Sequence, residues 1–267
     1  MFGAIAGDII GSVFEGNPVK SKDFCLFSPA SRYTDDTVLT LAVGEALLAD
    51  RDYASNFRAF YRMFPDRDYG EGFRRWADSP EGRPCYSYGN GSAMRAGPIG
   101  WAFAALPEVL HEARHCAAVT HNHAEGIKGA QAVAAAVYLA RKSYPKSAIK
   151  SYISNTFGYD LDRTLDQIRP DYAFDVSCAG SVPESIIAFL ESCDFEDAVR
   201  NAISLGGDSD TMACIAGAIA EAYYKHMSPE ICSAIFDYLP GHLAHIALQF
   251  RDRHCRYDGL PQPVDCL

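Results

Sequence analysis

Two short segments of the sequence concentrate carboxylates and threonine hydroxyls directly before apolar helical stretches. Residues 33–37 read YTDDT and precede VLTLAVGEALL, and residues 206–211 read GGDSDT and precede MACIAGAIAEAYY. A single Asp or Thr is enough to cap a helix, and early acids suit the helix dipole. Two acids and a hydroxyl at both helix starts exceed what capping requires, so a metal site is the alternative.

The donors in these two segments are oxygens, because neither segment contains Cys or His. Oxygen-only ligand sets suit Mg²⁺ or Mn²⁺ rather than Zn²⁺. If the two helix starts converge in space, they supply four carboxylates. Such a set is typical of a two-metal site that activates water or holds substrate oxygens.

Helices must position these segments, because helical periodicity dominates the chain and alternating strand patterns are nearly absent. We predict an all-α fold of about a dozen helices in a single compact domain over residues 1–267. The predicted helices cover residues 3–14, 36–50, 53–63, 92–105, 108–119, 124–142, 146–156, 183–191, 195–204, 209–225, 229–238 and 241–251. Two long irregular loops remain, 65–91 and 157–182, and loops of this length inside a compact domain are often functional.

The composition excludes several classes of protein. The 267 residues are 48% hydrophobic and 22% charged, which is ordinary for a globular protein. A formal net charge of -10 argues against general nucleic-acid binding and against binding to anionic membranes. No segment reads as a secretory signal or a membrane span. The nine cysteines include no C-x-x-C pair, which favours reduced thiols and a cytoplasmic protein, and we expect a monomer.

Six blocks that occur in order along the chain resemble the ADP-ribosylglycohydrolase family, which includes the dinitrogenase-reductase-activating glycohydrolase and the ADP-ribosyl-acceptor hydrolases. The blocks are GAIAGDIIGSVFEG, YTDDT, SYGNGSAMRAGP, THNHAEGIKGAQA, VPESIIAFL and SLGGDSDTMACIAGAIAEAYY. The resemblance implies an all-α fold with two Mg²⁺ ions at the bottom of an ADP-ribose cleft. It implies metal ligands at Thr34, Asp35, Asp36, Asp208, Asp210 and Thr211.

The same resemblance extends the predicted site beyond the metal ligands. Glu15 reads by itself as an exposed acid in a helix-ending turn, but serine-type members of the family have a glutamate there that lies over the metals and gates entry. A Gly-rich turn can hold a pyrophosphate through backbone N–H groups. By resemblance, that turn contacts the distal ribose and diphosphate, and His121 lines the phosphate side. The turn consists of Ser87, Tyr88, Gly89, Asn90 and Gly91.

For the adenine, the sequence leaves the choice open. Val182 with Pro183 and the aromatic rings of Phe174 or Tyr172 are the candidates that flank the base.

The implied reaction is hydrolysis of the glycosidic bond at C1 of the distal ribose of ADP-ribose. Asp36 or Asp210 would take the proton of the water, and Glu15 would protonate the leaving group or gate entry. The substrate would be an ADP-ribosylated protein or a small ADP-ribose conjugate. The arginine-linked, nitrogenase-regulating branch of the family carries Asp where this chain has Ser87, which favours an O-linked acceptor such as serine over arginine. O-acetyl-ADP-ribose and modified nucleic acid stay open.

Two alternatives belong to other classes of function. Residues 111–115 read HEARH, which matches the H-E-x-x-H zinc-protease motif, with His111 and His115 as ligands and Glu112 as base. His121 then falls where a third ligand of a metzincin would lie, although Ala118 replaces the required glycine. A non-catalytic ADP-ribose-binding protein is the other alternative, since a lens-crystallin relative has this fold. There we would expect acids to be missing from the clusters, and none is missing.

Overall fold

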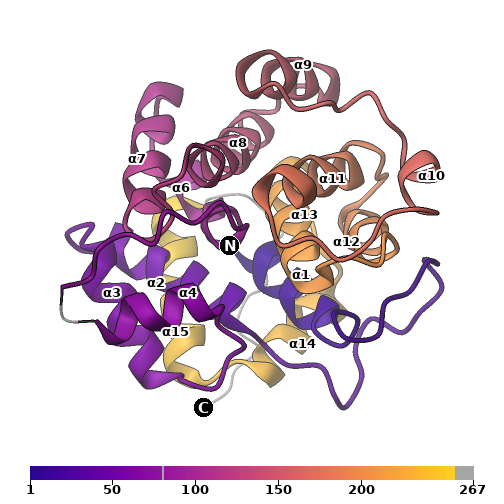
Figure 1. Ribbon diagram of the computed structural model, residues 1–267. Coiled ribbons are helices and arrows are strands. Elements are labelled where there is room, and N and C mark those ends of the chain that lie inside the picture. The colour runs from indigo at the N-terminus through magenta and orange to yellow at the C-terminus, as the bar shows by residue number, and fades with distance from the viewer. Residues whose placement is uncertain (80, 256–267) are drawn as a thin grey trace.

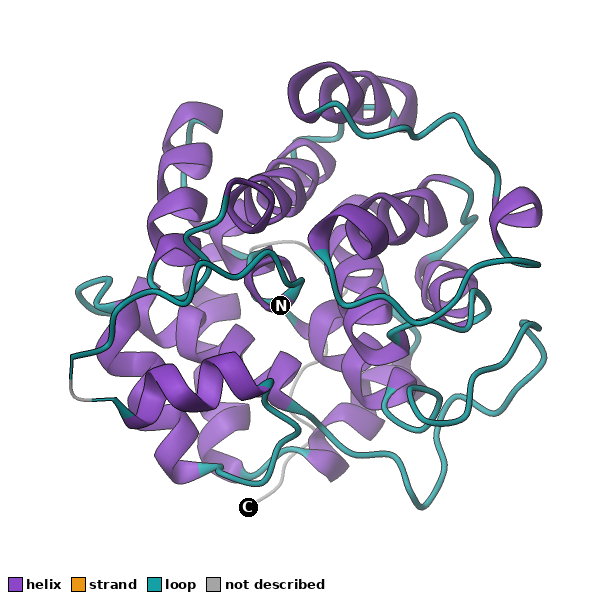
Figure 2. Cartoon of the chain, in the orientation of Figure 1, coloured by secondary structure: helices purple, strands orange, loops and turns teal. Residues whose placement is uncertain are grey.

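A computed structural model describes residues 1–79 and 81–255 and consists of helices joined by loops (Figure 1). Within these residues the helices are α1 (Phe2–Gly11), α2 (Asp35–Leu48), α3 (Tyr53–Met63), α4 (Glu71–Asp78), α5 (Gly91–Met94), α6 (Gly97–Ala102), α7 (Leu106–Ala118), α8 (Ala124–Arg141), α9 (Lys146–Phe157), α10 (Leu165–Ile168), α11 (Cys178–Leu190), α12 (Phe195–Ile203), α13 (Ser209–Tyr224), α14 (Pro229–Tyr238) and α15 (Gly241–His254). Figure 2 draws no strand among them. The prediction of an all-α fold is confirmed, whereas residues 256–267 of the predicted domain lie outside the described residues.

The structure has more helices than predicted, because the sequence pattern did not reveal α4 and α10 and did not separate α5 from α6. α4 and α10 lie inside the two stretches that we interpreted as irregular loops. The predicted helix 92–105 is also wrong as a single element, because the chain breaks between α5 and α6. Pro98 stands in the first turn of α6, where a residue without an N–H group starts a helix rather than continuing one.

The predicted start of α11 at Pro183 is wrong by five residues, since α11 begins at Cys178 and contains Pro183. The Ser177 side chain accepts a hydrogen bond from the backbone N of Gly180 and caps the helix. An effective cap upstream of the proline therefore determined the start, whereas we assumed that the proline occupies the first turn.

The buried helices α1 and α13 form the centre of the fold and pack side by side (Figure 1). Gly3, Gly7 and Gly11 occur every four residues and form one face of α1. A Cβ atom on any of them would come within 2.1 to 2.5 Å of a backbone oxygen of α13. Only glycine permits this close approach, which brings Asp8 of α1 beside the start of α13.

The two long loops that we predicted to be functional meet each other at the start of α11. Gly89 and Ser177 form an isolated antiparallel bridge. The backbone N of Asn90 donates to the oxygen of Val176 at 2.7 Å, and the N of Cys178 donates to the oxygen of Tyr88 at 2.9 Å. This pairing fixes the Gly-rich turn against α11.

None of the described helices has the length and apolar character that a bilayer span needs.

Candidate active site

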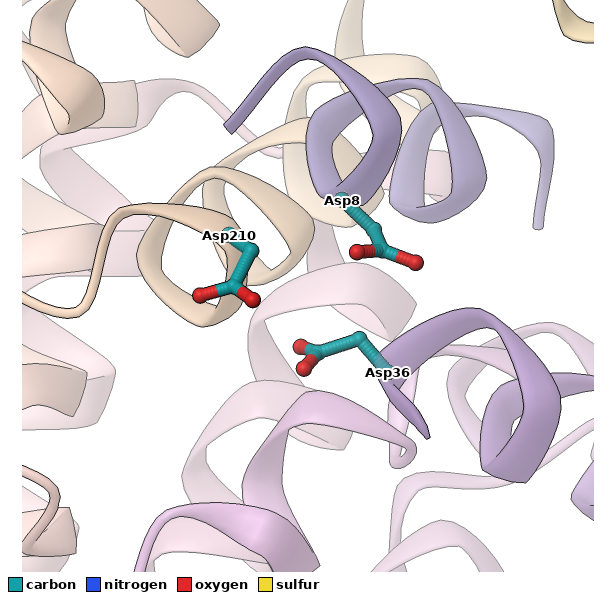
Figure 3. Close-up of side chains that lie close together, drawn as sticks. All are labelled: Asp8, Asp36 and Asp210. Carbon is teal, nitrogen blue, oxygen red and sulfur yellow. The ribbon is translucent and has the colours of Figure 1, made fainter. Parts of the chain in front are cut away.

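Three carboxylates from three helices meet at the centre of the fold, and Figure 3 shows them pointing toward one another. Asp8 lies on α1, Asp36 in the first turn of α2, and Asp210 in the first turn of α13. One oxygen from each lies within 4.8 Å of the others, and all three side chains are buried. A cation between them would therefore have oxygen ligands from three separate elements.

A second trio consists of Glu15, Asp208 and Asp210, so that Asp210 belongs to both. Asp208 is the N-cap residue of α13, yet its side chain makes no capping hydrogen bond. Its carboxylate instead accepts a hydrogen bond of 2.7 Å from Nδ2 of Asn90. Helix capping alone therefore does not explain the second acidic segment.

Threonine hydroxyls connect the carboxylates of the first trio. The Thr34 hydroxyl accepts from the backbone N of Asp36, which caps α2, and donates to Oδ1 of Asp8 at 2.8 Å. The Thr211 hydroxyl donates to Oδ2 of Asp36 at 3.1 Å. Asp35 is half-buried and belongs to neither trio, although it lines the adjoining cavity.

Asp8 is a residue of this cluster that sequence reasoning missed. Its carboxylate accepts hydrogen bonds of 3.0 Å from the backbone N of Thr34 and of Thr37, in addition to the Thr34 hydroxyl. Asp8 thus ties α1 to the start of α2. A lone Asp in the apolar stretch GAIAGDIIG was the available signal, because a fully buried acid is rare unless it is paired or binds a ligand.

The charge in this cluster fits a divalent cation. Oδ1 of Asp36 is buried and has no hydrogen-bond partner among the described residues. Burial, and after it the neighbouring carboxylates, raise the pKa of Asp36 and of Asp210 well above the usual range. A cation would relieve this repulsion and give Asp36 Oδ1 a partner, since hard divalent ions prefer carboxylate oxygens.

We expect the metal-free protein to lose stability as the pH rises. Burial raises the pKa of Asp8 from 3.8 to about 6, so between these values the folded protein holds a proton that the unfolded chain has lost. Raising the pH through this window favours unfolding, and the raised pKa values of Asp36 and Asp210 add to the loss. In EDTA, the melting temperature should be several degrees lower at about pH 7.5 than at about pH 5, and Mg²⁺ should remove most of the difference. A metal-free protein that is most stable at the higher pH would contradict this expectation.

A cavity of about 270 Å³ adjoins the carboxylates and is lined by most of the predicted site residues. The predicted residues that line it are Glu15, Asp35, Asp36, Ser87, Gly89, Asn90, Gly91, His121, Asp208, Asp210 and Thr211. Thr34 and Tyr88 do not line it. The structure therefore brings segments from across the chain to one cavity.

The loop that carries Glu15 is held against this cavity by its own contacts. The ammonium of Lys20 donates to the backbone oxygens of Tyr172 and Leu205, both at 2.5 Å. The rings of Phe14 and Phe24 pack at 4.7 Å between centroids. Glu15 is half-buried, and burial together with the charge of Asp208 raises its pKa.

The Gly-rich turn offers fewer free donors than the sequence suggests. The N–H of Gly89 donates to Oγ of Ser87 at 3.1 Å, and the N–H of Asn90 is bound to Val176. These two groups are therefore not available to a pyrophosphate in this arrangement. The side chain of His121, which faces the same turn, keeps its Nε2 atom without a hydrogen bond to the described residues.

The aromatic candidates for the adenine differ in exposure. Phe174 is 55% exposed. Tyr88 of the Gly-rich turn, which sequence reasoning did not consider for the base, is 58% exposed, and its ring packs against His123. Tyr172 is half-buried, and its hydroxyl donates to the backbone oxygen of Gly180. Val182 and Pro183 are buried within α11, so of these residues the two exposed rings are the ones accessible to a planar base.

Among the further cavity-lining residues that sequence reasoning missed are three with charged or hydroxyl side chains, Asp68, Arg95 and Thr120. Asp68 forms an ion pair of 3.1 Å with Arg32. Arg95 lies inside the block SYGNGSAMRAGP, where an arginine within an apolar stretch was the available signal. Thr120 is the first residue of the block THNHAEGIKGAQA and directly precedes His121, whereas Asp68 stands in no pattern that marks it.

The H-E-x-x-H motif has no metal-binding geometry. The groups of described residues that could hold a metal include neither His111 nor His115. Glu112 is buried and lies 2.9 Å from Nδ1 of His115 and 3.5 Å from Arg51, while His111 is exposed. The motif therefore serves the packing and ion pairing of α7, and the zinc-protease alternative has no support in the described chain.

Fold and site together define a helical protein with a buried acidic centre, suited to a hard cation, at the side of a ligand-sized cavity. Comparison with known proteins agrees with this class. The sequence model of the ADP-ribosylglycohydrolase family matches residues 1–250. The chain therefore belongs to the ADP-ribosylglycohydrolase family, and it is an enzyme of the ADP-ribosylglycohydrolase class.

Individual relatives match most of the chain at modest identity. ADP-ribosylhydrolase ARH3 of Mus musculus is 29% identical over 305 residues, which cover 83% of this chain and 82% of that protein. ADP-ribosylarginine hydrolase Tri1 of Pseudomonas putida is 26% identical over 300 residues, with 97% and 79% covered. The solved structure of an ADP-ribosylglycohydrolase-related protein complex has a TM-score of 0.69 at 24% identity, covers 94% of this chain and 95% of its own, and supports the fold.

Proposed function

We propose that this enzyme hydrolyses the bond between C1 of the distal ribose of ADP-ribose and an acceptor, with two Mg²⁺ ions as cofactor and Mn²⁺ as a substitute. The observation that carries the proposal is the pair of carboxylate trios that share Asp210 at the wall of the cavity. Two trios with one common member suit two neighbouring cations. Asp8, Asp36 and Asp210 would hold one ion, and Glu15 would lie beside the ion at Asp208 and Asp210.

The roles of the remaining residues follow from their positions. Thr34 and Thr211 would orient the carboxylates or act as further oxygen ligands, and Asp35 would be a further acidic ligand at the cavity. Asp36 or Asp210 would accept the proton of the attacking water. When bound, the cations would lower the pKa of that water and hold the ribose hydroxyls in orientation.

The Gly-rich turn, which adjoins the acids through the hydrogen bond from Asn90 to Asp208, would bind the rest of ADP-ribose. Ser87, Gly89, Asn90 and Gly91 line the cavity on the turn that we assign to the diphosphate, together with His121. Tyr88 would stack on the adenine from outside the cavity, because its ring is exposed. We also propose that the enzyme acts on an ADP-ribosylated protein or a small conjugate and that it is a monomer. A cytoplasmic location is favoured by its unpatterned cysteines.

An O-linked acceptor such as serine is our first candidate, because neutral Ser87 replaces the acid of the arginine-linked branch. Arginine is the second candidate, and one observation favours it. Glu15, Asp35 and Asp68 all line the cavity, and carboxylates attract a guanidinium cation. The relative named ADP-ribosylarginine hydrolase also supports this candidate.

Metal removal tests the proposal most directly. We expect release of free ADP-ribose from modified peptides to fall to background in EDTA, because the cluster would lose the cations that orient water and ribose. Mg²⁺ or Mn²⁺ should restore activity, and Zn²⁺ should not. Full activity after metal stripping, verified by elemental analysis of the sample, would refute the cofactor assignment.

A further inference from the structure

Three side chains that line the cavity form a hydrogen-bonded row. Nη2 of Arg95 donates to Oγ1 of Thr120 at 2.7 Å, and Oγ1 of Thr120 lies 2.7 Å from Nδ1 of His121. All three residues line the cavity, yet they are 0%, 1% and 8% exposed. Neither the acidic clusters nor the proposed hydrolysis accounts for the first two residues of this row.

The chemistry of the three side chains determines which atom is the donor in each hydrogen bond of the row. Arginine can only donate, so the Thr120 oxygen accepts from Arg95. The Thr120 hydroxyl proton then needs an acceptor, and among the described residues Nδ1 of His121 is the one within reach. If Nδ1 carried the proton instead, the buried Thr120 proton would have no acceptor, which costs about 1–3 kcal/mol. Nδ1 therefore accepts, and the proton of the imidazole lies on Nε2.

The imidazole is neutral in this environment. Burial, and after it the positive charge of Arg95, lower the pKa of His121 to about 3. A neutral ring with Nδ1 as acceptor presents one N–H donor, at Nε2. The row therefore makes His121 a fixed donor rather than a group that changes charge near neutral pH.

The Nε2 atom faces the Gly-rich turn. A Cβ atom on Gly91 would lie 3.2 Å from Nε2, and one on Gly89 would lie 3.7 Å from it. Glycine at both positions lets the ring approach the turn closely, and Gly89, Gly91 and His121 all line the cavity beside Nε2. A ligand atom that accepts a hydrogen bond can occupy this space.

Arg95 places a buried positive charge at the wall of the cavity. Its guanidinium lies over the ring of Phe57 at 4.2 Å and forms no ion pair with the described residues. Nε and Nη1 are buried without hydrogen-bond partners among them. A buried cation without a carboxylate partner favours a negative charge nearby, and a ligand in the cavity that Arg95 lines can supply one.

We propose that Arg95 and Thr120 are positioning residues that hold His121 as an Nε2–H donor to an anionic phosphate oxygen of the ligand at the Gly89–Gly91 turn. The identity of the anion as the diphosphate of ADP-ribose rests on the proposed function. The proton arrangement of the three side chains does not rest on the proposed function. An experiment can therefore contradict the identity of the anion without contradicting the proton arrangement.

The ring nitrogens of His121 test the proton arrangement directly. In ¹⁵N-labelled full-length protein with Mg²⁺ at pH 7, two-bond ¹H–¹⁵N correlation should show a neutral ring with a pyrrole-type Nε2 and a pyridine-type Nδ1. The signals are assigned by their loss in His121→Gln. A charged ring, or a proton on Nδ1, would overturn the proposal without any variant of Thr120.

Thr120→Val and Thr120→Ser test the positioning role. Valine keeps the shape but removes the hydroxyl, so His121 should become a mixture of tautomers, and the Kd for ADP-ribose by calorimetry and the KM should rise about tenfold with kcat little changed. Serine keeps the hydroxyl and should restore both the ring spectrum and the affinity. Thr156→Val, at an exposed position of α9, is the matched control and should behave as wild type.

Pyrophosphate and adenosine, titrated separately, identify the part of the ligand involved. Thr120→Val should weaken pyrophosphate and leave adenosine unchanged. Equal loss for both probes, or a Thr120→Val protein with wild-type ring signals and affinity, would overturn the proposal. If the wild type shows the predicted ring state and binds pyrophosphate but not ADP-ribose, the proposed function fails and the positioning role stands.

Discussion

Asp36→Ala and Asp210→Ala are each expected to abolish turnover, with a loss of at least about 10³-fold in kcat, because each removes a ligand that the proposed cation needs. Asp36 supplies a buried oxygen that no described residue satisfies, and Asp210 belongs to both carboxylate trios. Hydrolysis of an ADP-ribosylated peptide in saturating Mg²⁺, followed by release of free ADP-ribose, measures the effect.

The double variant separates one shared site from two independent contributions. Residues that act as a unit are strongly non-additive, so Asp36→Ala with Asp210→Ala together should be little worse than either alone. The metal-free single variants should also melt at a higher temperature than the metal-free wild type, since repulsion among buried acids is relieved. Mg²⁺ should stabilise the variants less than the wild type.

Asp237→Ala is the matched control, because Asp237 is exposed on α14 and outside the cavity. It should keep wild-type turnover and wild-type stabilisation by Mg²⁺. If Asp36→Ala or Asp210→Ala instead kept turnover near that of this control, that residue would have to be removed from the proposed site.

Helix starts were the part of this site that the sequence could predict. A cap and a change to helical periodicity are local signals, so the segments YTDDT and GGDSDT could be placed at the first turns of two helices. The structure places Asp36 and Asp210 in those turns. That the two turns would meet could be expected only from the resemblance to a family, because convergence of distant helices is not written in any local pattern.

Asp8 shows why the rest was harder to find. It is one acid within an apolar helix, and its place beside Asp210 depends on the face of Gly3, Gly7 and Gly11 that lets α1 approach α13. That face is visible in the sequence, but its partner is not. Arg95 and Thr120 are similar, since the hydrogen bond between them joins residues 25 positions apart in the chain.

The loops were predicted as functional from their length, which was informative, but their structure was not predictable. The bridge between Gly89 and Ser177 pairs two loops that are far apart in sequence. Because this pairing is tertiary, neither loop contains a signal for it. It also fixes the position of Ser177, whose side chain caps α11 upstream of Pro183, which is why the proline was a misleading marker.

Glu15→Gln is expected to reduce kcat on an ADP-ribosyl-serine peptide by about 10²-fold or more, the usual scale for a general acid. Glu15 lines the cavity beside Asp208, on a loop that Lys20 and the Phe14–Phe24 contact hold in place. An oxygen leaving group needs a proton as its bond breaks, and burial of Glu15 favours the protonated carboxyl. Glutamine keeps the size and polarity of the side chain but cannot donate that proton. Binding of free ADP-ribose should survive within a few-fold.

The acceptor decides how this result is interpreted, so the serine-linked and arginine-linked peptides are compared at equal concentration with wild type, Glu15→Gln and Glu15→Ala. Glu230→Gln, at an exposed position of α14, is the control for the chemical change and should match wild type. We expect wild type to release ADP-ribose faster from serine, and both Glu15 variants to lose that reaction while retaining ADP-ribose affinity. Faster release from arginine by the wild type would overturn the choice of acceptor and assign Glu15, Asp35 and Asp68 to attraction of the guanidinium. It would leave the proposed hydrolase unchanged, because Asp8, Asp36 and Asp210 would act on the ribose, which both substrates share.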